Sequence, residues 1–329
     1  MKKILNYLFE YKTLTRAQAK EVLVNISKNQ YNESEVAAFI TVFLMRSITI
    51  EELQGFRDAL LELCVRVNLE DGDVIDIVGT GGDGKNTFNI STLSCFIVAG
   101  AGHKVAKHGN YGATSVSGSS NVMEQLGYTF KNDAGTLQKE LDDANICFLH
   151  APVFHPALKA VGPIRKNLGV RTFFNMLGPM VNPAFPKHQL VGVYSLEMAR
   201  IYNYLLQPTG NNFTIIHSLD GYDEISLTGD TKVITAAGEK IYSAEQLGKR
   251  TVSAADIYGG NTAEEAAKLF LKIIKGEGSW AQNAVVLSNA AMALQCTGKY
   301  NHYDECYRAA VESLESGKAY NSLLKITGR

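Results

Sequence analysis

Hydrophobic positions in the first part of the chain recur at the spacing of amphipathic helices, about 3.6 residues per turn. The stripes lie within residues 22–26, 36–43 and 53–67. Each stripe is preceded by a polar pair at capping-box spacing: Thr15 with Gln18, Asn32 with Glu35, and Thr49 with Glu52. We therefore predict a small all-helical domain over residues 1–70, completed by part of residues 155–180.

Beyond residue 73, short β-branched runs alternate with helical patterns. The expected buried strands are residues 74–78, 104–107, 146–149, 190–194 and 213–216. Helical patterns separate several of them, at residues 91–101, 119–126 and 196–206, and the helical pattern returns over residues 262–324. Such alternation is typical of a parallel sheet covered by helices. The predicted fold class is α/β, with the small helical domain joined to a larger α/β domain, residues 71–329, that has a mainly parallel central sheet.

Composition and charge narrow the class of protein. The 329 residues are 46% hydrophobic and 20% charged, which is typical of a folded globular protein of two domains. The net charge of −1 argues against a nucleic-acid or membrane partner, because no overall field would attract the chain to a polyanion. No stretch approaches the roughly 20 apolar residues of a membrane span, and the N-terminus lacks a signal-type apolar run. We expect a cytoplasmic protein.

A glycine-rich loop follows the first expected strand. Residues 79–92 read Gly-Thr-Gly-Gly-Asp-Gly-Lys-Asn-Thr-Phe-Asn-Ile-Ser-Thr and lead into a helix. Backbone N–H groups of such a turn, together with the positive end of the helix dipole, favour a phosphate group. The loop therefore predicts local phosphate binding.

Two common phosphate-loop patterns fit this segment poorly. The spacing of Gly79, Gly81 and Gly84 matches a dinucleotide fingerprint, but the next expected strand leads into Lys107 and His108 rather than a ribose-binding acid. The same segment matches a nucleoside-triphosphatase loop, except that Asn86 stands where a Ser or Thr should bind Mg²⁺. A third kind of phosphate site is favoured.

Eight motifs, taken in order, indicate which kind. They are Gly-Thr-Gly-Gly-Asp at 79–83, Asn-Ile-Ser-Thr at 89–92, Lys-His-Gly-Asn at 107–110, Ser-Gly-Ser at 117–119, His-Pro-Ala at 155–157, Arg-Lys-Asn-Leu-Gly-Val-Arg-Thr at 165–172, Asn-Met-Leu-Gly-Pro at 175–179 and Asp-Glu-Ile-Ser at 223–226. Across nearly the whole chain this series resembles the anthranilate phosphoribosyltransferase family of tryptophan biosynthesis.

The resemblance implies a reaction and two substrates. The phosphoribosyl group of phosphoribosyl pyrophosphate would move to the amine of anthranilate, giving N-(5-phosphoribosyl)anthranilate and pyrophosphate. The implied phosphoribosyl pyrophosphate site contains Gly79, Gly82, Asp83, Thr87, Asn89, Ser91, Thr92, Lys107 and Ser119. We expect the glycine loop to bind the pyrophosphate, and Lys107 with Ser119 to bind the 5′-phosphate.

The resemblance also implies a metal site and an acceptor site. Ser91, Asp223 and Glu224 would hold Mg²⁺, two ions per active site. On sequence alone the two acids fit an ordinary solvated turn better, and it is the resemblance that favours the metal site. Anthranilate would be bound by Gly79, His108, Asn110, His155, Arg165 and Gly178. The guanidinium of Arg165 suits a carboxylate because it forms two parallel hydrogen bonds.

Some features depart from the family pattern or leave alternatives. Tyr111 and Val116 stand where many relatives carry basic residues, so two cations near the site are missing. A pyrimidine nucleoside phosphorylase and a non-catalytic nucleic-acid-binding relative remain as alternatives. The characteristic motifs of the nucleoside phosphorylases do not occur in this sequence. A nucleic-acid-binding relative would be expected to be markedly basic. Relatives suggest a homodimer through the helical domain, with Tyr7, Tyr11 and Leu14 offering apolar surface.

Overall fold

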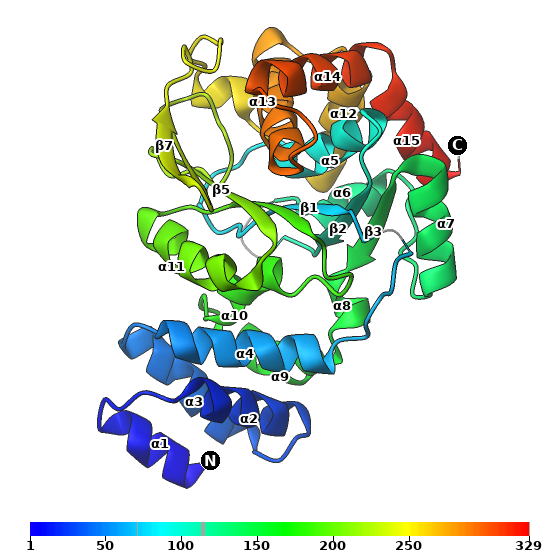
Figure 1. The fold of residues 1–329 in the computed structure, drawn as a ribbon. Coiled ribbons are helices and arrows are strands. Elements are labelled where there is room, and N and C mark those ends of the chain that lie inside the picture. Colours follow the sequence, from blue (N-terminus) through cyan, green and yellow to red (C-terminus); the bar gives the residue numbers. More distant parts are fainter. Residues whose placement is uncertain (71, 113–115, 329) are drawn as a thin grey trace. The chain divides into compact units, whose positions relative to one another are not determined.

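The computed structural model describes residues 1–70, 72–112 and 116–328. The chain divides into two compact units (Figure 1). Unit 1 comprises Met1–Val67 and Ala151–Pro183, and unit 2 comprises Asn68–His150 and Ala184–Arg329. Residue 71, the predicted start of the α/β domain, lies outside the described residues. The predicted fold class, a small helical domain joined to a larger α/β domain, is confirmed.

Unit 1 is built from helices whose starts follow the predicted capping pairs. Its helices are α1 (Lys2–Phe9), α2 (Arg16–Ser27), α3 (Glu33–Met45), α4 (Ile50–Leu63), α8 (Ala151–Phe154), α9 (Pro156–Leu168) and α10 (Phe174–Leu177), with a 3-10 turn η1 (Gly178–Met180). The capping boxes at Thr15, Asn32 and Thr49 are all present, each with both reciprocal hydrogen bonds. These three predicted helix starts are therefore confirmed.

The core of unit 1 is aromatic. Phe39, Phe43, Phe56 and Phe173 lie with ring centroids between 4.5 and 6.5 Å apart, mostly edge to face. Such pairs contribute about 0.5–1.5 kcal/mol each beyond their burial. Because Phe173 comes from the second stretch of the unit, the cluster joins that stretch to α3 and α4.

Unit 1 also contains a buried ionic cluster around Glu52. This carboxylate is fully buried and accepts hydrogen bonds from Arg46 at 2.9 Å, from the N–H of Leu14 at 2.9 Å and from the N–H of Thr49 at 2.9 Å. Burial alone would raise the pKa of Glu52, but these hydrogen bonds outweigh it and hold the pKa below its ordinary value. The predicted exposure of Leu14 is wrong, because Leu14 is only 3% exposed and its backbone N–H is bonded to the buried Glu52.

We expect Glu52→Ala to lower the free energy of unfolding by about 3–5 kcal/mol, because the change leaves the side chain of Arg46, which is only 11% exposed, without its carboxylate partner. Urea denaturation followed by circular dichroism measures the effect. Glu62→Ala is the matched control, since Glu62 pairs with Lys20 at the surface and such pairs contribute little. Equal urea midpoints for the two variants would contradict the assignment.

Unit 2 contains a seven-stranded sheet in the order β3-β2-β1-β4-β5-β6-β7. Its strands are β1 (Ile75–Gly79), β2 (Val105–Gly109), β3 (Ile146–His150), β4 (His188–Gly192), β5 (Asn212–Ser218), β6 (Thr231–Thr235) and β7 (Gly238–Tyr242). The strands from β3 to β5 are parallel, as predicted. Sequence analysis missed β6 and β7, which extend the sheet as an antiparallel hairpin.

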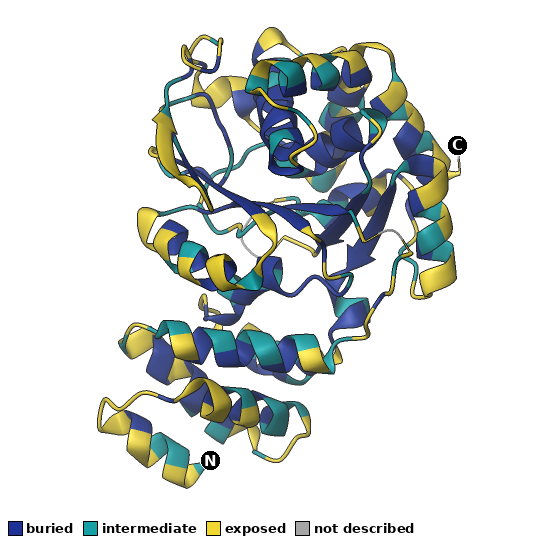
Figure 2. Ribbon diagram, viewed as in Figure 1, coloured by how far each residue is buried: buried dark blue, intermediate teal, exposed yellow. Residues whose placement is uncertain are grey.

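Helices cover both faces of this sheet (Figure 1). They are α5 (Ile90–Gly100), α6 (Ser119–Gln125), α7 (Ala134–Ala144), α11 (Leu196–Leu206), α12 (Ala263–Ile274), α13 (Trp280–Cys296), α14 (Tyr303–Glu315) and α15 (Lys318–Thr327), with 3-10 turns η2 (Gln207–Thr209) and η3 (Ala254–Ile257). Helices α5 and α13 are buried along nearly their whole length and form the centre of the core (Figure 2). Within the described ranges, no helix is both long enough and apolar enough to cross a membrane.

Candidate active site

Three neighbouring parallel strands of unit 2 end in glycine. These are β2 at Gly109, β1 at Gly79 and β4 at Gly192. A Cβ atom at Gly79 would lie 2.4 Å from Oδ2 of Asp223, and one at Gly192 would lie 1.6 Å from the backbone oxygen of Asp223. A Cβ atom at Gly109 would lie 2.5 Å from Oγ of Ser119. Glycine at each position therefore lets a polar residue approach the carboxyl edge of the sheet.

The glycine loop after β1 adopts left-handed backbone at several positions. Gly81, Gly82 and Gly84 have φ angles of 62°, 79° and 72°. Residues with a side chain rarely adopt this region, so these glycines allow a tight backbone turn. Asp83 lies inside the turn, and its Oδ1 accepts the N–H of Lys85 at 2.9 Å.

Asp223 is fixed directly against this loop. Its Oδ2 accepts the N–H of Gly81 at 2.7 Å, and the side chain is close enough to Asp83 for the two carboxyl groups to interact. Burial, and then the charge of Asp83, raise the pKa of Asp223 to about 7. Burial likewise raises the pKa of Asp83. The alternative considered from the sequence, that this acid lies in a solvated turn, is wrong for Asp223, because Asp223 is only 8% exposed.

Glu224 binds the start of α5. Its Oε1 accepts the N–H of Ser91 at 3.0 Å, and its Oε2 accepts the hydroxyl of Thr87 at 3.4 Å. A carboxylate at this end of a helix is favoured by the helix dipole. Burial, followed by the charges of Asp223 and Asp83, raises the pKa of Glu224 well above its ordinary value. The structure thus brings Thr87, Ser91 and Glu224 together.

The remaining predicted residues of this segment are Asn89 and Thr92. Asn89 is the N-cap residue of α5, but its amide donates to the carbonyl of Ser117 at 3.0 Å instead of capping the helix. Thr92 is 1% exposed within α5. Asn89 therefore ties the glycine loop to the segment that precedes α6.

The acidic residues supply the kind of donors that Mg²⁺ prefers. Asp83, Asp223 and Glu224 offer only carboxylate oxygens, and their pKa values are raised by loss of water contact and, for Asp223 and Glu224, by the neighbouring acids, effects that a cation would offset. Among the described residues, no three His, Cys, Asp or Glu side chains form a ready metal cage. Mg²⁺ commonly uses one or two carboxylates and completes its shell with water and phosphate oxygens. The donor set fits that mode of binding.

Lys107 and Ser119 are not directly joined. The ammonium of Lys107 donates to the carbonyl of Ile77 at 2.7 Å, and the residue is 2% exposed. No carboxylate in the part of the chain that the structure describes lies within ion-pair distance of it. Ser119 Oγ donates to the carbonyl of Asn110 at 3.3 Å. Lys107 is thus a buried cation beside the end of β1.

The residues after Lys107 belong to the same strand end. The N–H of His108 donates to Oδ1 of the buried Asp76 at 3.1 Å. Asn110 is exposed, and its side-chain oxygen accepts the N–H of Tyr111 at 2.8 Å. Tyr111 donates its hydroxyl to Glu124 on α6 at 2.7 Å. This tyrosine therefore supports the turn instead of supplying a charge.

Arg165, His155 and Gly178 lie in unit 1. The guanidinium of Arg165 on α9 lies 5.3 Å from the ring centroid of Phe174 and donates to Oδ1 of Asn175 at 3.4 Å. Burial lowers the pKa of Arg165, yet arginine remains a cation at neutral pH. No ion pair joins it to any carboxylate among the described residues.

His155 and Gly178 contribute differently. His155 is 1% exposed, and burial lowers its pKa to about 4, so its ring is neutral at pH 7. Gly178 opens the turn η1, and a Cβ atom there would meet open space. No steric clash with the described residues therefore requires glycine at this position.

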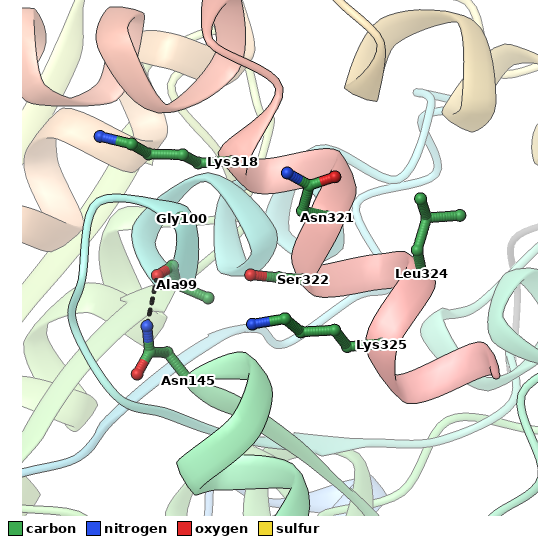
Figure 3. A pocket seen from close by; sticks show the side chains of 8 residues that line it. All are labelled: Ala99, Gly100, Asn145, Lys318, Asn321, Ser322, Leu324 and Lys325. Atoms are coloured by element: carbon green, nitrogen blue, oxygen red, sulfur yellow. Dashed lines mark hydrogen bonds between the residues drawn. The ribbon is translucent and has the colours of Figure 1, made fainter. Parts of the chain in front are cut away.

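A separate cavity lies elsewhere in unit 2. It has a volume of about 430 Å³ and is lined by Ala99, Gly100, Asn145, Lys318, Asn321, Ser322, Leu324 and Lys325 (Figure 3). Its two lysines are already engaged, Lys318 with Glu312 at 2.8 Å and Lys325 with the carbonyl of Asp143 at 2.6 Å. None of these lining residues is a predicted site residue, so the cavity plays no part in the candidate site.

Sequence analysis missed one segment that contacts the glycine loop. Residues 257–260 run beside residues 86–88 and share two backbone hydrogen bonds with them. The only sequence signal was the pair Gly259-Gly260, which alone indicates nothing more than a turn.

Comparisons with known proteins agree with this architecture. The helical bundle domain of a glycosyl transferase family matches residues 2–64, and the a/b domain of that family matches residues 71–320. The chain is 59% identical over 326 residues to anthranilate phosphoribosyltransferase of Christiangramia forsetii, covering 99% of this chain and 98% of the relative.

Solved structures show the same likeness. Anthranilate phosphoribosyltransferase of Thermus thermophilus has a TM-score of 0.89 and 31% identity, covering 98% of both chains. The Saccharomyces cerevisiae enzyme in complex with PRPP and Mg has a TM-score of 0.87 and 29% identity, covering 96% of this chain and 93% of that one. Fold and site therefore define a two-domain glycosyl transferase. Within that class, the chain belongs to the anthranilate phosphoribosyltransferase family.

Proposed function

We propose that this protein transfers the phosphoribosyl group of phosphoribosyl pyrophosphate to the amine of anthranilate, releasing pyrophosphate. The observation that carries the proposal is the carboxylate pair Asp223 and Glu224, fixed by backbone N–H groups of the glycine loop and of α5. Family membership supplies the identity of the substrates.

The glycine loop and the start of α5 would bind the pyrophosphate. Gly79, Gly82 and Asp83 supply the turn, and Thr87, Asn89, Ser91 and Thr92 supply the polar groups that follow it. Lys107 and Ser119 would bind the 5′-phosphate. Support for Lys107 comes from its burial without a carboxylate partner, because a buried cation is costly unless an anion accompanies it.

Ser91, Asp223 and Glu224 would hold magnesium, and we infer two ions per site. When bound, the metal neutralises negative charge on the pyrophosphate leaving group. The protein itself contributes the fixed positions of these oxygens, since Gly81 and Ser91 restrain the two carboxylates before substrate arrives. Such preorganisation avoids rearrangement during the reaction.

Arg165 would bind the carboxylate of anthranilate, with Gly178 and Gly79 allowing backbone close to the ring. Asn110 is suited to hydrogen bonding with the acceptor because its side chain is exposed. His108 and His155 are buried, which favours a packing role for their rings. In the reaction the amine nitrogen bonds to the anomeric carbon as the bond to pyrophosphate breaks. The attacking amine is already neutral at pH 7, so it needs no deprotonation before attack, and the proton that the nitrogen loses once the new bond has formed would pass to water or to the released pyrophosphate.

The cytoplasmic location and the homodimer also stay predictions. On the helical unit, Tyr7, Phe9 and Tyr11 are 38%, 60% and 82% exposed. Exposed apolar side chains near one another favour an interface. Sedimentation analysis of the full chain tests the predicted dimer.

We expect Lys107→Met to weaken the binding of phosphoribosyl pyrophosphate about tenfold. This factor corresponds to the lower end of the range for a charge-assisted contact, which is roughly 1.5–3 kcal/mol. Methionine keeps most of the buried volume and removes only the ammonium. Steady-state kinetics should show a much smaller change in the Michaelis constant for anthranilate. Lys104→Met, which removes a cation paired with Asp142, is the control. An unchanged constant for phosphoribosyl pyrophosphate would remove Lys107 from the phosphate site.

The proposed function is tested by measuring pyrophosphate release with matched acceptors. With Mg²⁺ and phosphoribosyl pyrophosphate, anthranilate should release pyrophosphate and form one N-phosphoribosyl product, identified by its mass. Benzoate, which lacks the amine, should release none. Uridine or thymidine with inorganic phosphate should yield no free base. Release of a base without turnover of anthranilate would favour the nucleoside phosphorylase alternative.

A further inference from the structure

The segment that precedes α12 pairs with the glycine loop. The N–H of Phe88 donates to the carbonyl of Ile257 at 3.2 Å, and the N–H of Gly259 donates to the carbonyl of Asn86 at 2.8 Å. Thr87 and Tyr258 form an antiparallel bridge between these two bonds. The backbone of residues 86–88 is therefore held by a second chain segment.

Asn86 adds a side-chain bond to this pairing. Its amide donates to the carbonyl of Gly260 at 2.7 Å, so Asn86 is bonded to the segment through both its backbone and its side chain. This residue stands where a nucleoside-triphosphatase loop would carry a metal-binding hydroxyl. In this chain its side chain braces the loop instead.

The backbone around Gly259 leaves no space for a side chain. A Cβ atom there would lie 2.3 Å from the backbone oxygen of Thr87, 2.6 Å from its carbonyl carbon and 2.9 Å from the backbone nitrogen of Phe88. All three are backbone atoms, which cannot rotate away as a flexible side chain can. Any larger residue at 259 must therefore push the backbone of Thr87 and Phe88.

The bracing segment is itself well anchored. Ile257 is fully buried in the core of unit 2. On the other side, Oε2 of Glu265 in the first turn of α12 accepts the N–H of Asn261 at 2.7 Å, and the hydroxyl of Tyr258 donates to Oδ1 of Asn261 at 2.6 Å. The segment that carries Gly259 is thus held on both sides, by the burial of Ile257 and by the bonds of Asn261.

The same stretch also contacts Glu224. Thr87 donates its hydroxyl to Glu224, and the N–H of Ser91, four residues on, donates to the same carboxylate. We propose that Asn86 and Gly259 are positioning residues, which fix Thr87 and Ser91 against Glu224 and so shape the end of the site that takes phosphoribosyl pyrophosphate with its metal. This inference rests on the proposed function of that site.

The test compares Gly259→Ala with Gly135→Ala, which makes the same chemical change on the exposed first turn of α7. A Cβ atom at Gly135 would meet only Oδ1 of Asp133, at 3.6 Å. For Gly259→Ala we expect the Michaelis constant for phosphoribosyl pyrophosphate to rise about tenfold and the Mg²⁺ requirement to increase. The constant for anthranilate should stay within a factor of about three, since that change corresponds to well under 1.4 kcal/mol. Gly135→Ala should match wild type.

Asn86→Ala is the second variant, because it removes the bond to Gly260 without adding an atom. We expect the same selective effect at a smaller size, about threefold to tenfold, the range for loss of one hydrogen bond. Thermal unfolding of each variant shows whether it folds.

Two outcomes would overturn the proposal. One is that both variants bind both substrates as wild type does. The other is that both lose stability while the two Michaelis constants change equally, as for ordinary structural residues. Failure of the proposed function is distinguishable, because wild type and Gly135→Ala would then also be inactive with anthranilate.

Discussion

The double variant Asp223→Asn with Glu224→Gln should lower turnover by about 10²-fold to 10³-fold, the scale of losing preorganised electrostatic stabilisation of a transition state. Each amide keeps the size of the acid and one oxygen that can accept the N–H of Gly81 or Ser91. The negative charge that would hold magnesium is lost. The fold should persist, because neutral side chains relieve the repulsion among buried carboxylates.

This expectation is measured by steady-state kinetics over a range of Mg²⁺ concentrations, and circular dichroism checks the fold. Asp220→Asn is the matched control. Asp220 lies in the same turn, but its carboxylate accepts a hydrogen bond from Thr228 and not from the glycine loop or α5 among the described residues. The control should retain turnover at ordinary Mg²⁺. Normal activity of the double variant at low Mg²⁺ would remove both acids from the metal site.

Arg165→Ala should raise the Michaelis constant for anthranilate by about tenfold to a hundredfold, at about 1.4 kcal/mol for each factor of ten. The guanidinium is partly buried beside Phe174 and Asn175 without a carboxylate partner among the described residues, so an anionic ligand would complete its interactions. Arg165→Lys should recover little, because an ammonium cannot form the planar two-bond contact.

Calorimetry with phosphoribosyl pyrophosphate alone separates this role from general damage. Affinity for that substrate should stay within a factor of about two to three of wild type, which is well under 1 kcal/mol. Lys166→Ala, the exposed neighbour on α9, is the control and should leave both constants unchanged. If the variant lost affinity for both substrates equally, or for neither, Arg165 would have only a structural role on its helix.

The fold could be predicted wherever local patterns carry the information. The capping boxes at Thr15, Asn32 and Thr49 are short-range features, and all three are observed. The five buried strands could be recognised because they are short β-branched runs. The hairpin partner β7 could not, because its residues Gly238–Tyr242 are mostly exposed and lack an apolar run.

The residue types of the site could be predicted from the sequence, but the hydrogen-bond partners of these residues could not. The acids at 223 and 224 are visible in the sequence, whereas their bonds to Gly81 and Ser91 join residues 142 and 133 positions apart. The bond from Lys107 to Ile77 ends on a backbone carbonyl, which has no sequence signature. For the same reason the contact of Asn86 with Gly260, across 174 positions, appears only in the folded chain.

The central claim is that this protein joins anthranilate to phosphoribosyl pyrophosphate, and anthranilate fluorescence tests it most directly. With purified full-length protein, phosphoribosyl pyrophosphate and Mg²⁺, the fluorescence should fall until the limiting substrate is consumed, with one pyrophosphate released for each anthranilate lost. Omission of phosphoribosyl pyrophosphate, or removal of Mg²⁺ by a chelator, should stop the fall. Fluorescence that stays constant in the complete mixture, with protein shown to be folded, would contradict the claim.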